Sequence, residues 1–205
     1  MAYTTVNKSS DFFNTVLYTS TGNDNLAISG VGFEADLTWI KKRAVVSGSN
    51  TNEAHMWADQ VRGYDKWISS SSNNPDQTYT AGLKSWQSDG FTLGTVNRVN
   101  QGSTPHTYAA WNWKAGGGQG SSNTDGSINT TYTSANTTAG FSISKYTGTG
   151  ANATFGHGLG VKPDIVFWKR LDNAAGAVNW IVQSPLLGNQ EKIVLNTTEA
   201  KSNNS

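Results

Sequence analysis

The sequence contains no cysteine. Disulfide scaffolds, thiol nucleophiles and cysteine-based zinc sites are therefore excluded. Charged residues are also scarce, at 14% of the 205 residues, and the net charge is only +1. A chain this weakly charged gives no electrostatic reason to expect a nucleic-acid partner or an anionic membrane surface.

Long apolar runs are missing as well, and none reaches the length that a membrane-spanning helix needs. The N-terminal segment MAYTTVNKSSDFF has no basic stretch followed by an apolar one. We therefore expect no signal peptide and no membrane insertion, with synthesis in a cytoplasm.

Aromatic residues and glycine are plentiful. The chain has eight Trp, seven Tyr, seven Phe and 22 Gly, and 36% of its residues are apolar. Aromatic rings bury large areas and favour strands, whereas glycine favours turns and weakens helices. This composition predicts an all-β protein with a substantial core.

An internal repeat is the main organising feature. SGVGFEADLTWIKKR at residues 29–43 returns as HGLGVKPDIVFWKR at residues 157–170, with an offset of 128 (157 − 29). The same offset relates Asp36 to Asp164. Glycine turns, apolar bulk, this aspartate and a basic end persist in both copies. These features indicate a turn that enters a buried strand, and they predict a duplicated β lobe.

The repeat divides the chain into three parts. We expect a first β-sandwich lobe with an N-terminal strand at residues 1–114, a Gly/Ser-rich linker at 115–139 and a second lobe at 140–205. The first lobe continues into the hairpin SDGFTLG and the strand TYAAWNWKA, which the second lobe lacks. An unfinished lobe exposes strand edges, so we expect its missing strands in further chain or in a neighbouring subunit.

Histidine and carboxylate residues offer no catalytic pattern. His55, His106 and His157 are far apart and lack metal-ligand spacing. A glycosidase needs two opposed carboxylates. The candidates are Glu34, Asp36, Glu53, Asp59, Asp65 and Asp89. Asp36 begins a strand and Asp89 precedes a glycine, so both are better explained as turn residues. We expect no enzyme, cofactor or metal site.

Tryptophans are the remaining candidates for ligand contact. Trp111 and Trp113 share one face of a predicted strand and are expected in the core. Trp67 and Trp86 lie near polar loops, so these two are the candidates for stacking on a sugar, even though core packing also explains them.

A series of motifs carries a family resemblance. In order they are DLTWIKKR, HMWADQVRG, SDGFTLG, YAAWNWKAGG, AGFSISKYTGTG and GHGLGVKPDIVFWKR. Together they resemble a repeat domain of structural proteins of tailed bacteriophages, especially phages of marine bacteria and cyanobacteria. The hairpin and the following Tyr-Ala-Trp strand are also similar to concanavalin and laminin-G sandwiches. The resemblance implies an antiparallel jelly-roll, here duplicated with the second lobe incomplete.

The resemblance also implies a function. We expect a virion structural protein, made in the host cytoplasm and displayed outside the particle as a tail fibre, a tail-associated protein or a head decoration. Its partners would be other virion proteins, copies of itself and, as an open alternative, a host-surface glycan. A lectin-like carbohydrate-binding module is the alternative function. A polysaccharide-cleaving enzyme on the jelly-roll fold is a third.

Overall fold

The computed structural model describes residues 6–43, 53–102, 104–173, 176–188 and 190–203. The expected unit boundaries at residues 1 and 205 lie outside these ranges. Nearly all regular structure in the described residues is antiparallel strand, which confirms the all-β prediction. Among these residues, no helix is long and apolar enough to span a membrane.

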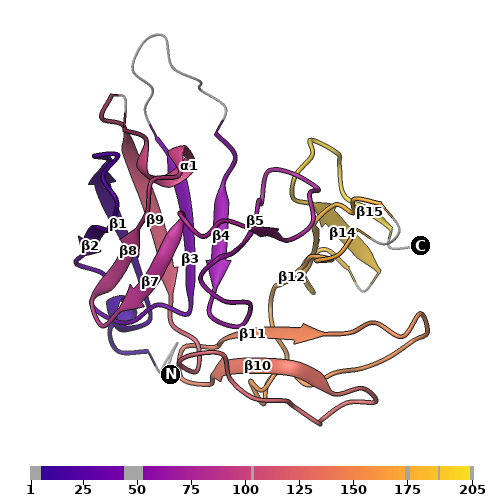
Figure 1. Ribbon diagram of the computed structural model, residues 1–205. Helices are drawn as coiled ribbons and strands as arrows, with labels where there is room; N and C mark the ends of the chain where they lie inside the picture. Colours follow the sequence, from indigo (N-terminus) through magenta and orange to yellow (C-terminus); the bar gives the residue numbers. More distant parts are fainter. Residues whose placement is uncertain (1–5, 44–52, 103, 174–175, 189, 204–205) are drawn as a thin grey trace.

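The largest sheet has six strands (Figure 1). In spatial order they are β1 (Phe13–Thr19), β9 (Thr107–Trp113), β3 (Leu37–Lys42), β4 (Met56–Asp59), β5 (Lys66–Ile68) and β6 (Gln77–Thr78). β9 pairs along its full length with β1 on one side and with β3 on the other. The last strand of the first lobe in sequence therefore lies inside its sheet, next to the edge strand β1.

A three-stranded sheet and the first sheet enclose the core, in a sandwich-like arrangement. In order, its strands are β2 (Leu26–Ser29), β8 (Gly90–Leu93) and β7 (Leu83–Gln87). The core cluster between the two sheets includes Ile40, Met56, Trp67, Phe91 and Tyr108. Two short helices, η1 (Ser9–Asp11) and α1 (Asn97–Asn100), complete the first lobe.

A hairpin follows the first lobe. It is formed by β10 (Thr130–Asn136) and β11 (Phe141–Tyr146). β10 lies inside the range 115–139 that was expected to be linker, so the second half of that range is paired strand. The hairpin contacts the first lobe, because the Phe141 ring stacks on Trp113 of β9 with 6.2 Å between the ring centroids.

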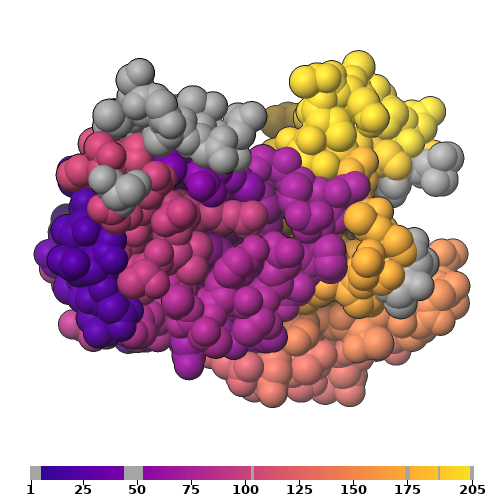
Figure 2. Space-filling view, turned by 45° about the horizontal axis from the view of Figure 1, so that its top comes forward, coloured from indigo at the N-terminus to yellow at the C-terminus, as the bar shows by residue number. Residues whose placement is uncertain are grey.

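The last strands form a four-stranded meander, which we call the second meander. They are β12 (Val166–Trp168), β13 (Ile181–Gln183), β14 (Glu191–Val194) and β15 (Ser202–Asn203). Their order repeats that of β3, β4, β5 and β6 in the first sheet. Figure 2 shows the second meander (yellow) as a bulge beside the first lobe (indigo to magenta).

The two meanders also share their registers. Ile40 pairs with Met56 in the first sheet, and Trp168 pairs with Ile181 in the second meander. The offsets are 128 (168 − 40) and 125 (181 − 56). The outer pairs agree too, because Lys66–Thr78 and Glu191–Asn203 are both related by 125 (191 − 66 and 203 − 78).

Aromatic side chains join the second meander to the first sheet. The Trp57 ring lies between two rings of the second meander, with centroid distances of 5.9 Å to Phe167 and 5.1 Å to Trp180. Trp180 is buried, and its Nε1 donates to the Ser69 carbonyl at 2.8 Å. The junction therefore combines apolar burial with a satisfied indole donor.

Candidate ligand-binding site

A row of tryptophans covers the outer face of the six-stranded sheet. Side chains alternate between faces along a strand, so Trp39 on β3 points away from the core that holds its neighbour Ile40. Ring centroids lie 5.1 Å from Trp39 to Trp57, 5.6 Å to Trp111 and 6.4 Å to Trp113. Trp111 and Trp113 are half-buried on this outer face, so the expectation that they belong to the core is wrong.

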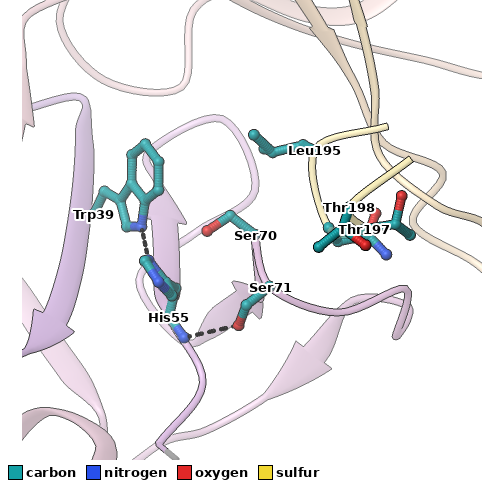
Figure 3. A pocket seen from close by; sticks show the side chains of 8 residues that line it. Trp39, His55, Ser70, Ser71, Leu195, Thr197 and Thr198 are labelled. Atoms are coloured by element: carbon teal, nitrogen blue, oxygen red, sulfur yellow. Dashed lines mark hydrogen bonds between the residues drawn. The ribbon is translucent and has the colours of Figure 1, made fainter. Parts of the chain in front are cut away.

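One end of this row opens into a pocket of about 310 Å³ (Figure 3). Its lining residues are Trp39, His55, Ser70, Ser71, Leu195, Asn196, Thr197 and Thr198. The first four come from the first lobe, and the last four follow β14 in the second meander. The pocket therefore exists only because the two parts of the chain pack against each other.

His55 is the titratable group of this pocket. Trp39 Nε1 donates to His55 Nδ1 at 2.8 Å, so Nδ1 is unprotonated and Nε2 carries the hydrogen. Burial lowers the pKa of His55, and the charge of Lys41 lowers it further. The backbone N–H of His55 donates to Ser71 Oγ at 3.3 Å. The imidazole is thus held neutral and oriented.

The pocket combines an aromatic wall with hydroxyl, amide and imidazole groups. An indole face packs well against the C–H groups of a sugar ring, and the polar groups can hydrogen-bond to its hydroxyls. No carboxylate is among the residues that line this pocket.

The expected sugar-stacking residues lie elsewhere. Trp67 is 2% exposed and belongs to the core cluster between the two sheets, in agreement with the core-packing alternative. Trp86 is half-buried against the same cluster, and its Nε1 donates to Thr38 Oγ1 at 3.0 Å. Neither tryptophan lines the pocket.

One of the candidate carboxylates, Asp59, binds an arginine together with Asp76. The Arg62 guanidinium lies 2.6 Å from Asp59 Oδ2 and 2.8 Å from Asp76 Oδ1, and it also donates to the Trp57 carbonyl at 3.0 Å. Burial raises the pKa of Asp76, although the Arg62 charge opposes this effect. This cluster fixes the turn after β4 and accounts for Asp59 structurally.

Asp36 connects the first lobe to the chain that follows it. Its Oδ2 accepts hydrogen bonds from the backbone N–H groups of Ala115 at 2.6 Å and Gly117 at 3.2 Å. The side chain is fully buried, and burial raises its pKa. Asp36 directly precedes β3, and the segment that its side chain binds lies 79 residues further along the chain.

Asp89 holds the glycine turn that opens the repeat. Its two carboxylate oxygens accept from Gly32 N at 2.6 Å and from Gly30 N at 3.2 Å. Both glycines have positive φ values, of 86° and 89°, which favour glycine. Asp89 is therefore a turn residue, as its sequence context indicates.

The three histidines, His55, His106 and His157, do not lie together in one site. His106 is buried and its backbone N–H donates to Ser20 Oγ at 2.9 Å, whereas His157 Nδ1 accepts from Leu159 N at 3.1 Å. Within the described ranges, no group of three His, Asp or Glu side chains is placed to hold a metal ion.

A second cavity of about 220 Å³ lies where β11 approaches β12. Tyr146 and Phe155 stack at 4.3 Å, and Trp168 meets Phe155 edge-on at 5.6 Å. The buried Nε1 of Trp168 has no hydrogen-bond partner. Burial raises the pKa of Tyr146. Its lining side chains are mostly aromatic or aliphatic, and fewer of them than in the first pocket can hydrogen-bond to a ligand.

Sequence reasoning missed the pocket around Trp39. The alternation of Trp39 with the core residue Ile40 is a signal that its side chain lies on the outer face of the sheet. The contribution of Asn196 and Thr197 has no such signal, because it depends on how the second meander packs.

Comparison with known proteins places this chain in a family. A model described as "Domain of unknown function (DUF7483)" matches residues 8–205. The chain belongs to this family. The match spans the first lobe, the β10–β11 hairpin and the second meander, so the pocket residues from both sides lie within the DUF7483 region. No curated protein and no solved structure matches the chain.

Proposed function

We propose that this DUF7483 protein is a structural component of a bacteriophage particle, displayed on its exterior as a tail fibre, a tail-associated protein or a head decoration. The observation that carries the proposal is a group of exposed apolar side chains in the second lobe. These are Val161, Ile165, Phe167, Leu186 and Ile193. Phe167 and Ile193 lie on the same face of the second meander, because both pair with Val182, and an exposed apolar face marks a surface that an assembly covers. The resemblance to phage structural proteins suggests that this assembly is a phage particle.

We further propose that the fold is a concanavalin- or laminin-G-like jelly-roll that was duplicated, with the second copy incomplete. The identical strand order and register of the β3–β6 and β12–β15 meanders support this proposal. A chance meander would have no reason to repeat these registers, with an offset of 128 between β3 and β12 and of 125 for the strands that follow.

The protein would act by being displayed on the outside of the particle. The first lobe has a closed core and supplies a rigid unit, whereas the second lobe provides the apolar surface that other virion proteins or copies of the chain cover. Because homo-oligomers usually adopt closed symmetry, the copies are expected to meet around a symmetry axis.

Mass spectrometry of purified particles tests the proposal. The protein should remain with particles through density-gradient purification at a stoichiometry that fits a symmetric assembly. Limited proteolysis of intact particles should release its fragments, because the protein is displayed outside. Loss of the protein from gradient-pure particles would disprove a virion role.

A lectin-like role is a second candidate, carried by the Trp39 pocket. Its aromatic wall, two serines, Asn196 and two threonines suit a neutral glycan. A glycan array should show binding that Trp39→Ala abolishes. Tyr64→Ala is the matched control, because Tyr64 is an exposed aromatic residue that does not line the pocket. Equal binding by both variants would argue against the pocket.

We do not propose a polysaccharide-cleaving activity. Such an enzyme needs two opposed carboxylates at a cleft. The linings of the two cavities within the described residues contain none.

A further inference from the structure

The second meander has an open edge at β12. In the first sheet, β3 lies between β4 and β9 and pairs with both. β12 occupies the position of β3 in the second meander, and β13 occupies that of β4. Within the described residues, however, β12 pairs with β13 alone. The position that β9 fills in the first sheet is therefore unfilled beside β12.

Side chains near this edge are exposed where their counterparts are buried. Ile165 is 54% exposed, whereas Leu37 (165 − 128) is 2% exposed. Val161 is 67% exposed, whereas Phe33 (161 − 128) is 4% exposed. Both residues of each pair are apolar. The two copies therefore differ in the exposure of these side chains but not in their apolar character. The simplest physical explanation is that a covering element is present in the first lobe and has no counterpart at β12.

Backbone groups at the same edge have a defined direction. In the first sheet Arg43 N donates to the Thr107 carbonyl at 2.7 Å, at the end of the β3–β9 ladder. Every second residue of β3 counted back from Arg43 therefore directs its N–H and C=O groups at β9. With the offset of 128, these positions include Ile165 and Phe167. Their backbone groups face the open edge.

We propose that the open edge of β12 binds an extended strand supplied by a different polypeptide of the particle. The inference rests on the proposed assembly function, which provides the neighbour. Pairing of an extended segment with an exposed sheet edge is a general mode of peptide recognition, in which the main chain gives affinity and alternate side chains give specificity.

The first sheet indicates the chemistry of the strand. On β9, Trp113 lies opposite Leu37 and Trp111 lies opposite Trp39. The equivalents of Leu37 and Trp39 are Ile165 and Phe167, which are both apolar. The bound strand should therefore carry large aromatic side chains at alternate positions and no charge between them.

β11 provides a second, independent observation. β9 has β1 as its other neighbour in the first sheet. β11 contains Phe141, which corresponds to Phe13 of β1 (141 − 128), and it also pairs on one side only, with β10. Both strands that correspond to the neighbours of β9 thus keep an unpaired edge among the described residues.

A peptide with the β9 sequence is the direct probe. A labelled peptide that spans residues 105–115 is titrated into the 205-residue chain, with fluorescence anisotropy as the readout. A peptide of the same composition in scrambled order is the peptide control. Hydrogen exchange then locates the contact, with protection expected in residues 165–169.

Two lysine variants distinguish peptide binding at the β12 edge from nonspecific binding to exposed apolar side chains. Ile165→Lys places a charge at the open edge, which opposes strand addition, and should raise the dissociation constant by about tenfold or more. Leu186→Lys makes a similar change at a residue that is 94% exposed in the connection between β13 and β14. It should leave peptide binding unchanged. Circular dichroism checks that both variants are folded.

The outcomes are distinct. Peptide-dependent protection of residues 165–169, lost in Ile165→Lys and kept in Leu186→Lys, supports the proposal. Absence of binding, equal weakening by both variants or equal binding of the scrambled peptide overturns it. Self-association that protects residues 165–169 without peptide also overturns it, because a second copy would then be the occupant. Each of these failures leaves the mass-spectrometric test of the virion role untouched.

Discussion

Arg62 is the residue whose removal should destabilise the fold most clearly. Its side chain is 5% exposed and contacts Asp59, which is 3% exposed, and Asp76, which is 21% exposed. Arg62→Met keeps the apolar stem but leaves two carboxylates without their cation. Removing one partner of a buried ion pair costs about 3–5 kcal/mol. For a chain of this size, such a loss corresponds to a melting temperature lower by roughly 6–20 °C.

Arg170→Met is the matched control. Arg170 also binds a carboxylate, with 2.7 Å between its guanidinium and Asp172 Oδ1, but the two side chains are 30% and 69% exposed. Exposed ion pairs contribute about 0–1 kcal/mol. Urea unfolding followed by tryptophan fluorescence gives the free energy of unfolding of both variants relative to the unmodified chain.

A triple variant identifies the cause. If the unpaired carboxylates account for the loss, Arg62→Met combined with Asp59→Asn and Asp76→Asn should recover part of the stability, because no buried charge remains. A loss below about 1 kcal/mol for Arg62→Met, or a triple variant less stable than Arg62→Met alone, would refute the reasoning.

Three further predictions follow from buried groups and close contacts. Trp39→Ala should weaken the His55 orientation and raise the His55 pKa, because it removes the indole donor and part of the burial; NMR titration of the imidazole measures this. Gly82→Ala should prevent stable folding, since a Cβ there would overlap the Trp67 ring, whereas Gly148→Ala has open space and should change the free energy of unfolding little. Burial raises the folded-state pKa of Asp36 above its unfolded value, so its contribution is fully present below about pH 4 and is lost as the pH rises through the folded pKa. Relative to Asp36→Asn, the unmodified chain should therefore lose stability between pH 4 and neutral pH in urea unfolding; a flat difference would contradict this.

Much of the fold was predictable from the sequence because its signals are local. The aromatic and glycine content predicts strands and turns, and Asp89 before Gly90 predicts the turn between β7 and β8. The alternation in residues 141–146 predicts β11, and the apolar run before Lys41 predicts β3. These features depend on backbone preference and on side-chain period, which short segments carry by themselves.

The candidate site was predictable only in part, because burial of a tryptophan is decided by tertiary contacts. Trp67 precedes a polar loop, yet it lies on the core face of β5. Trp111 and Trp113 lie in an apolar strand, yet their face is the outer one. The sequence shows that two residues share a face, but it does not show which face receives the second sheet. Predicting the pocket would also require knowing that residues 195–198 lie beside Trp39.

The contacts between the second meander and the loop after β5 bear on mechanical strength. Trp180 donates to Ser69, Lys169 Nζ donates to the Asn73 carbonyl at 3.1 Å, and Asp76 N donates to the Leu171 carbonyl at 2.8 Å. A pulling force applied to the second meander would therefore enter the six-stranded sheet through this loop, and not only through the covalent connection after β9. Asp76 would pass that load to Arg62, deep in the turn after β4. In the virion role proposed above, shear would load this loop, which would then share tension between the second meander and the six-stranded sheet.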